Sequence, residues 1–146
     1  MNLSRALCVG SLVLLIVIAG CGGGSSFDPN NVTVTVSPAA VTIPASGQVT
    51  LQATVIGDPA APALTWRIAE LQANGASGAQ CNWQGTTPPA GPCPDGTIQQ
   101  LTVLNFQTVT YYAPSTPGTF HVIVEWSTAF SPIIIKDATS VITVGP

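Results

Sequence analysis

The stretch VTLQATV, residues 49–55, decides the fold class of this chain. Its apolar residues occupy every second position, and threonine and glutamine occupy the positions between them. The stretch FHVIVEW, residues 120–126, has the same period. Because successive side chains of a strand point to opposite faces of a sheet, this alternation predicts strands with one buried face.

Similar short runs recur from residue 32 to residue 144, and valine, isoleucine and threonine dominate them. This composition favours strands over helices. Segments rich in proline, glycine and serine separate the runs, as turns do. No convincing helical pattern occurs beyond the N-terminal segment, so the spacing predicts an all-β antiparallel sandwich or barrel.

The N-terminal segment has the pattern of a secretory signal peptide. Arg5 is the only charged residue before residue 28, and the stretch from Ala6 to Ala19 is almost wholly apolar. This stretch is too short to span a bilayer, which takes roughly 20 residues. A positive start, a short apolar stretch and small residues at its end predict export and cleavage. An N-terminal core helix and a true membrane span are the alternatives.

The sequence IAGC at residues 18–21 resembles the lipobox of bacterial lipoproteins. The resemblance covers residues 1–21 and implies cleavage before Cys21 and transfer of diacylglycerol to its thiol. Further acylation, with a chain such as palmitate, often follows at the new amine. Because two or more acyl chains hold a protein firmly at a membrane, the resemblance implies lipid anchoring at the cell envelope.

The residues after Cys21 favour a surface location and a loose attachment. Gly22 stands where an aspartate would imply retention, which in Gram-negative lipoproteins favours passage to the outer membrane. The sequence GGGSS at residues 22–26 predicts a flexible tether. We therefore divide the chain into a signal peptide (1–20), a lipidated cysteine with its tether (21–30) and one domain (31–146).

Charge and composition exclude nucleic acid as a partner. The chain without residues 1–20 keeps two basic and six acidic side chains, hence a net charge of −4 without the histidine. It has no basic patch for a phosphate backbone. Charged residues make up 6% of the chain against the usual quarter, so uncharged polar residues must supply the polar surface.

Cys81 and Cys93 are the two cysteines that remain once Cys8 is removed and Cys21 is lipidated. Disulfides persist in oxidising compartments, so we expect these two to form one. Their spacing is too long for a CxxC redox pair. No histidine or third cysteine lies nearby in the sequence to complete a zinc site.

Several motifs occur in the order found in bacterial immunoglobulin-like domains. They are VTVSPAAVTIPASG (34–47), VTLQATVIG (49–57), LTW (64–66), YAP (112–114), GTFHVIV (118–124) and SVITV (140–144). The chain resembles this family over residues 31–146. The resemblance implies an immunoglobulin-like antiparallel β-sandwich of about seven strands, with Trp66 in its core. The implied strands are 32–37, 40–43, 48–56, 63–69, 107–113, 118–128 and 137–145.

Residues 70–106 depart from the family because this segment is longer than its equivalent, and residues 96–103 within it are a candidate strand. In such a sandwich the segment lies at the end opposite to the N-terminus. We therefore expect the disulfide loop to face away from the membrane.

The disulfide loop would present Asn82, Trp83 and Gln84. Loops on rigid scaffolds often carry binding function. An exposed tryptophan stacks on a sugar or anchors a protein partner. The other interpretation is that Trp83 packs against the disulfide and covers the end of the sandwich.

No constellation of residues predicts catalysis, a metal site or a cofactor. His121 is the only histidine, and we expect it to form a surface pair with Glu125. The chain has no GxSxG nucleophile motif, no phosphate loop and no carboxylate cluster for calcium. We therefore expect a protein that is not an enzyme.

Two further groups of residues have no assigned role. Tyr111 and Tyr112 should divide between core and surface, with a hydroxyl bonded to nearby backbone. Three consecutive aliphatic residues, Ile133–Ile135, cannot all face one side of a strand. Either this run is buried under a loop, or part of it is an exposed contact patch on the tether side.

These observations predict a lipid-anchored, non-catalytic immunoglobulin-like module for surface display, adhesion or interaction with an envelope protein. The alternative is a lipoprotein that binds a glycan or small ligand through the Trp83 loop.

Overall fold

The computed structural model describes residues 27–58, 64–73, 81–85, 87–88, 93–100, 107–129 and 131–146. The signal peptide, Cys21 and the GGGSS tether lie outside these residues, so their assignments stay predictions. Phe27, within the range expected to be tether, packs on the domain. The Phe27 ring meets Trp126 edge to face, with 6.2 Å between the ring centroids.

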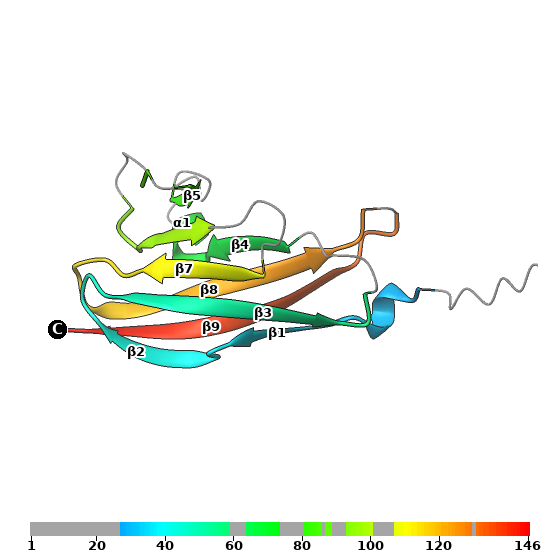
Figure 1. Cartoon of the computed structure of the whole chain (residues 1–146), viewed down its shortest axis with the longest axis horizontal. Helices are drawn as coiled ribbons and strands as arrows, with labels where there is room; N and C mark the ends of the chain where they lie inside the picture. Colours follow the sequence, from blue (N-terminus) through cyan, green and yellow to red (C-terminus); the bar gives the residue numbers. More distant parts are fainter. Residues whose placement is uncertain are drawn as a thin grey trace, which may run out of the picture.

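Two sheets form the molecule, as Figure 1 shows. The first sheet contains, in spatial order, β1 (Thr33–Ser37), β3 (Gln48–Ile56), β7 (Thr108–Tyr112), β6 (Thr97–Gln100) and β5 (Asn82–Gln84). The second contains β2 (Ala40–Pro44), β9 (Ile135–Gly145), β8 (Gly118–Ser127) and β4 (Leu64–Ile68). A 3₁₀ turn, η1 (Pro29–Asn31), precedes β1, and one short helix, α1 (Ala69–Ala73), follows β4.

The strand order is that of an immunoglobulin-like sandwich, as the sequence predicted. The first, second, fifth and fourth strands of that fold form one sheet, and the third, sixth and seventh form the other. Here β1, β3, β7 and β6 occupy the first sheet, and β4, β8 and β9 the second. The first strand divides into β1 and β2, and β2 crosses to the second sheet, where it pairs with β9.

The sheets are not wholly antiparallel, which the sequence analysis did not foresee. The edge pairs β2–β9 and β5–β6 are parallel, and the other recorded pairs are antiparallel. β5 is the addition to the expected strands. This three-residue strand comes from the long 70–106 segment and adds an edge strand to the first sheet.

The core consists of the inward rows of both sheets. The alternation of β8 shows the pattern, because Phe120, Val122, Val124 and Trp126 are buried and the residues between them are partly exposed. Trp66 of β4 is buried in this core, as predicted. The largest wholly buried side chains are Trp66, Tyr111, Leu51, Ile68, Leu71, Ile98 and Ile142.

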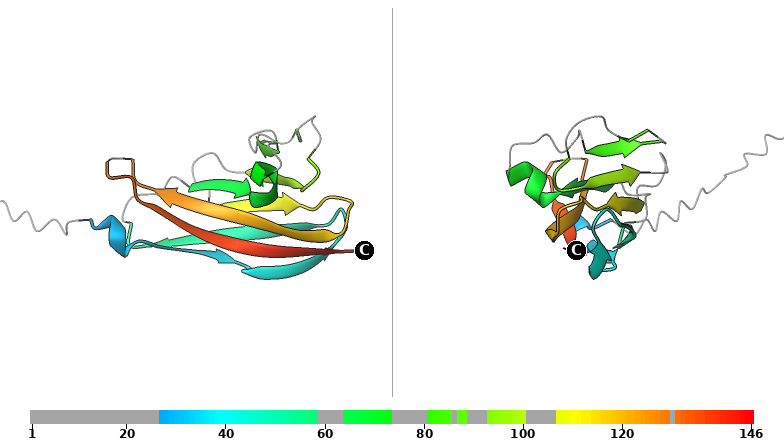
Figure 2. Two further views of the ribbon diagram at one scale, coloured as in Figure 1. Left: turned by 180° about the vertical axis from the view of Figure 1, so that it is seen from behind. Right: turned by 90° about the vertical axis from the view of Figure 1, so that its left-hand side faces the viewer.

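The two ends of the sandwich differ in what they carry. Phe27, η1 and the loop between β8 and β9 lie at one end, which we call the tether end (Figures 1 and 2). The C-terminus and the turn between β7 and β8 lie at the other end. α1 and β5 lie nearer the second end, as expected for the 70–106 segment.

A buried tyrosine ties β7 to the segment that leads into β6, a contact that we call the tyrosine corner. Tyr111 lies in the core, and its hydroxyl donates a hydrogen bond to the Asp95 carbonyl at 2.8 Å. Burial, with a smaller contribution from the Glu70 and Asp95 charges, raises the pKa of Tyr111 well above its usual value. Tyr112 faces the opposite side of the sheet, so the expected division between core and surface is confirmed.

Gly96 lets the chain approach this tyrosine corner closely. Its φ is +92°, and a Cβ atom at this position would lie 2.5 Å from the Tyr112 carbonyl oxygen and 2.7 Å from the Tyr111 hydroxyl. Gly85 has a similar φ of +88°, but a Cβ atom there would meet nothing within 4 Å. Alanine substitutions at Gly85 and Gly96 therefore distinguish the cost of backbone strain from the cost of a steric clash.

We expect Gly85→Ala to lower the free energy of unfolding by about 1 kcal/mol, through backbone strain only. Gly96→Ala adds a collision with backbone in the core and should cost about 3 kcal/mol. Urea denaturation of both variants measures the difference. Equal losses would contradict the close approach at Gly96.

Candidate functional site

The candidate site surrounds Trp83 on β5, at the edge of the first sheet. β5 pairs with β6 in a parallel register that places Trp83 beside Gln99. The Ile98 amide also donates to the Cys81 carbonyl, at 2.9 Å, just before β5. Three residues of ladder give a strand little stability, so β5 needs a second support.

The Cys81–Cys93 disulfide provides that support, and its prediction is confirmed. The sulfur atoms are 2.07 Å apart, and the Cα atoms are 5.7 Å apart. Cys81 belongs to the hydrophobic core, and the partly buried Cys93 packs against it. The bond therefore ties the start of β5 to the segment that leads into β6.

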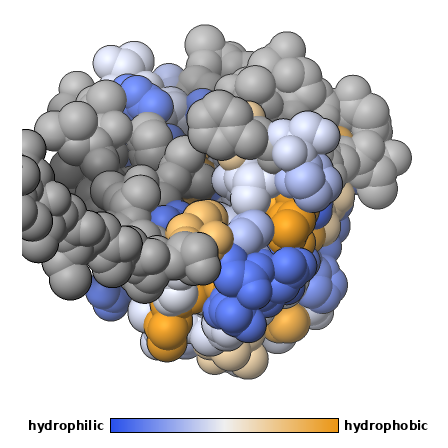
Figure 3. Space-filling view, turned by 90° about the vertical axis from the view of Figure 1, so that its right-hand side faces the viewer, coloured by the Kyte–Doolittle hydropathy of each residue, from blue (hydrophilic) through white to orange (hydrophobic). Residues whose placement is uncertain are grey.

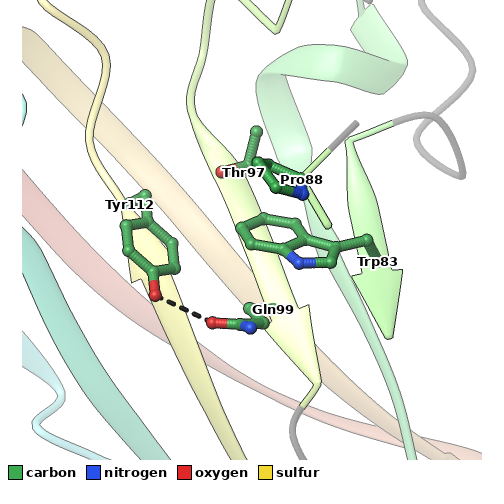
Figure 4. A pocket seen from close by; sticks show the side chains of 5 residues that line it. All are labelled: Trp83, Pro88, Thr97, Gln99 and Tyr112. Carbon is green, nitrogen blue, oxygen red and sulfur yellow. Dashed lines mark hydrogen bonds between the residues drawn. The ribbon is translucent and has the colours of Figure 1, made fainter. Parts of the chain in front are cut away.

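Trp83 and Tyr112 form an aromatic pair on the outer face of the sheet. Their ring centroids are 5.4 Å apart and their planes are tilted by 34°. The indole extends from β5 across β6, with Pro88 and Thr97 on one side and Gln99 on the other (Figure 4). These five residues line a shallow open pocket of about 350 Å³.

Gln99 holds the tyrosine of this pair in place. The Tyr112 hydroxyl donates to the Gln99 side-chain oxygen at 2.8 Å (Figure 4). The Gln99 Nε2 atom donates to the Gly85 carbonyl at 2.6 Å. Because Gln99 is only 8% exposed, its amide is a fixed bridge between β7 and the end of β5.

A second shallow pocket, of about 380 Å³, lies beside the same indole. Asn82, Trp83, Gln84 and Gln100 line it. The Asn82 Nδ2 atom donates to the Trp66 carbonyl at 2.7 Å, so this side chain also ties β5 to the core. The Gln84 and Gln100 amides are 3.5 Å apart at the exposed end of the pocket.

The structure places the three residues predicted for binding on one short strand, β5, nearer the end of the sandwich where they were expected. Trp83 does not cover the end of the sandwich. Its register partner Gln99 lies beside Thr110, which alternates with the inward-facing Val109 and Tyr111 of β7. The indole therefore lies on the outer face of the first sheet, and Asn82 faces inward.

The two pockets share an uncharged lining of aromatic, amide and hydroxyl groups. Two buried polar atoms beside them, Trp83 Nε1 and Asn82 Oδ1, have no hydrogen-bond partner within the described residues. Buried polar atoms without a partner are rare in folded proteins.

Tyr112, Thr97 and Gln99 are site residues that the sequence analysis missed. The sequence predicted that Tyr111 and Tyr112 divide between core and surface without deciding which faces outward, and Gln99 was part of a candidate strand. Alternation in β6 and β7 places them on outer faces. Only the sheet order and register bring them to Trp83.

The expected surface pair of His121 and Glu125 is wrong. His121 Nδ1 lies 2.6 Å from a Glu70 oxygen, and the other Glu70 oxygen accepts from the His121 backbone amide at 3.1 Å. Glu125 instead pairs with Arg67, at 2.7 Å. The reason is that β4 lies beside β8 and α1 packs on β8, which bring closer partners to both residues.

Other chemical features are few in the part of the chain described. No group of three or more His, Cys, Asp or Glu side chains there could hold a metal ion. No described helix is long and apolar enough to cross a membrane.

Comparison with known proteins adds fold similarity and no family. No protein-family model and no curated protein matches the chain. Among the solved structures that resemble it are three that each match over 77–78% of this chain. They are a nucleoside hydrolase-related hypothetical protein from Saccharophagus degradans associated with carbohydrate metabolism (16% identity, TM-score 0.47), a marsupial T cell receptor (12%, 0.40) and VCBP3 domain 1 from Branchiostoma floridae (16%, 0.40).

The aligned share of those chains is 25%, 52% and 94%, respectively. This chain thus spans a quarter of the first structure and half of the second. Similarity at this level carries no argument about function. The assignment of the fold rests on the strand order described above.

We expect reduction of the disulfide to loosen β5 and to lower the free energy of unfolding by about 3 kcal/mol, the value for a loop of this size. Trp83 should become more exposed, and tryptophan emission should shift to the red. The Trp83→Phe variant is the control, because Trp66 and Trp126 remain buried. A red shift of equal size in that variant would contradict the link between the disulfide and Trp83.

Proposed function

We propose that the protein is a lipid-anchored, non-catalytic binding module of the bacterial cell envelope. Its anchor is Cys21, and its recognition surface is the pair of pockets beside Trp83. In this proposal the domain is related to the immunoglobulin-like domains that recur in bacterial surface proteins. Its task is adhesion or interaction with an envelope partner.

One observation supports the binding role most: two aromatic rings, those of Trp83 and Tyr112, lie in contact in a site whose lining carries no charge among the described residues. The Trp83 and Tyr112 rings are in contact, and the Gln99 amide fixes the tyrosine from beneath. Tryptophan and tyrosine give binding sites large rigid contact areas at a low entropic cost. A pair that served only stability would belong in the core, whereas Trp83 is partly exposed at a sheet edge.

The arrangement of the two ends agrees with display from a membrane. Phe27 marks the tether end, and β5 lies nearer the opposite end (Figure 1). A chain attached through Cys21 therefore presents the Trp83 pockets away from its anchor. An interaction role needs this orientation, because the bilayer otherwise blocks access to the site.

The contacts of His121 support a non-catalytic role. The recorded partner of its ring is the Glu70 carboxylate, so the pair lacks the hydroxyl or thiol nucleophile of a triad. A second carboxylate of this face, Glu125, is bonded to Arg67. We assign these contacts to the attachment of α1 and β4 to β8.

A glycan is the second candidate partner, and the lining of the pockets favours it. Sugars combine apolar ring faces with many neutral hydroxyl groups. The pocket between Trp83 and Tyr112 offers aromatic faces together with the amide of Gln99 and the hydroxyl of Thr97. Pockets lined by aromatic side chains with a few polar groups are typical of small-ligand sites.

For the anchor, we expect mass spectrometry of the native protein to find an N-terminus at Cys21 that carries diacylglycerol and further acyl chains. The Cys21→Ala variant should remain unlipidated and leave the membrane fraction. An intact Met1 in the native protein, or an unmodified Cys21, would contradict the anchor.

For the recognition surface, we expect Trp83→Ala to weaken binding of the partner at least tenfold, about 1.4 kcal/mol, while the fold is kept. The control is His121→Ala, which removes an aromatic ring from the second sheet. Titration with soluble cell-wall and capsular glycans, followed by tryptophan fluorescence, tests the glycan. Cross-linked pull-down from envelope extract tests a protein. Binding by both variants with unchanged affinity would remove Trp83 from the site.

A further inference from the structure

Exposed large apolar side chains gather at one end of the molecule. Within the described residues they are Phe27 (44% exposed), Ile56 (63%), Ile133 (71%) and Ile135 (58%). Of the two interpretations of the Ile133–Ile135 run, exposure holds for the first and third residues. Ile134 is partly buried and packs against the core. The site beside Trp83 contains none of these residues.

Each of these residues stands where an element meets the tether end. Phe27 precedes η1 and packs on Trp126, which is near the end of β8. Ile56 ends β3 and is paired with Thr33, at the start of β1. Ile133 belongs to the connection from β8 to β9, and Ile135 begins β9, where it pairs with Ser127. Three segments distant in sequence thus contribute apolar side chains to one end.

Packing within the domain does not account for these side chains. Ile56 shares its outward row with Thr33, and the outward neighbours along β3 are Gln52 and Thr54. Ile135 shares its outward row with Ser127. The neighbours of both isoleucines in these outward rows are polar, and both side chains are more than half exposed, so we assign them to a contact outside the fold.

The shape of the tether end indicates the kind of partner. Figure 3 looks onto this end, and the hydrophobic residues visible there lie apart, with hydrophilic residues between them. Ile56 and Ile135 each have polar neighbours in their outward rows, so the described residues do not form the continuous apolar patch that a protein interface requires at its centre. A bilayer surface accepts them singly, because it is broad and deformable.

The length of chain outside the described structure selects the same partner. Six residue steps separate Cys21 from Phe27, and an extended chain covers at most about 3.5 Å per residue, or about 20 Å in all. A domain held by acyl chains at Cys21 therefore cannot leave the membrane surface by more than this distance. The end held closest is the one with exposed isoleucine and phenylalanine.

We infer that the tether end rests on the lipid bilayer, with Phe27, Ile56, Ile133 and Ile135 at the boundary between headgroups and acyl chains. This inference rests on the proposed lipidation of Cys21. It turns a loose attachment into a defined orientation and directs the Trp83 pockets outward. Partial insertion of aromatic and aliphatic side chains is the usual contact of surface-bound proteins with this boundary.

Charge at this end favours apolar contact over attraction to anionic lipid. Asp28 accepts hydrogen bonds from Asn30 and Asn31 in η1, and Asp58 accepts one from the Trp126 indole. Lys136 is the basic residue nearby, and Asp137 follows it. With acidic residues in excess, zwitterionic lipid should seat the domain at least as well as anionic lipid.

The test uses the full lipidated chain in phosphatidylcholine vesicles that contain brominated lipid. Ile133→Cys and Ser115→Cys carry the same fluorophore, at the tether end and in the exposed turn between β7 and β8 at the opposite end. Labelling is specific because Cys81 and Cys93 are bonded and Cys21 is acylated. We expect at least threefold stronger quenching at position 133 than at position 115.

A variant of the seat itself provides the second measurement. Ile56→Thr combined with Ile135→Thr keeps β-branched residues in both strands, so the fold is retained. Quenching at position 133 should fall at least twofold in this variant. Ile123→Thr, in the middle of β8, is the matched control and should leave quenching unchanged.

The outcomes separate this inference from the proposed function. Mass spectrometry that finds Cys21 unmodified overturns the anchor and the seat together. Confirmed lipidation with equal quenching at positions 133 and 115 overturns the seat only. Quenching that is equal at the two positions, together with dimers that the double threonine variant abolishes, assigns the same end to a second copy and also overturns the seat. Stronger seating on anionic than on zwitterionic vesicles overturns the apolar contact.

Discussion

Burial of two facing rows of side chains between the sheets is the constraint on which the structure depends. Each strand contributes every second residue to the interior, so the sheets adhere through valine, isoleucine, leucine and the ring of Trp66. Burial of apolar area is the main favourable contribution to folding. Few side chains of the chain are charged. Uncharged polar residues such as threonine and glutamine therefore supply much of the solvent-facing side of the sheets.

The edge of the first sheet depends on this interior but adds its own supports. β5 has only three residues, so the disulfide, the Asn82 bond to the Trp66 carbonyl and the Gln99 bond to Gly85 hold it against β6. These contacts keep a tryptophan partly exposed beside Tyr112. Exposure of an aromatic side chain in an edge strand is unfavourable, and such exposed apolar surface often marks a binding site.

In the proposed function the two ends of the sandwich have different roles, membrane contact at one and partner binding near the other. One end carries the start of the domain and four exposed apolar side chains. The Trp83 pockets lie nearer the other end, beside the tyrosine corner at Gly96. A rigid sandwich keeps these regions apart, so contact with a membrane at one end leaves the pockets accessible at the other. The length of the proposed tether then limits how far the domain can move from the membrane surface.

The sequence by itself determined the fold class, because a period of two and β-branched residues specify which face of each strand is buried. It also predicted the disulfide, since the expected loss of Cys8 and lipidation of Cys21 leave two cysteines, and it predicted the central place of Trp66. The tertiary structure decided what lies beside what. Three arrangements show this, and each joins segments distant in sequence. Trp83 lies beside Tyr112 and Gln99, and His121 pairs with Glu70 in place of the expected Glu125. Ile56 and Ile133 lie at the same end of the sandwich. Alternation gives the face of a residue, but the order and register of strands give its neighbours, and these are set only when the whole chain packs.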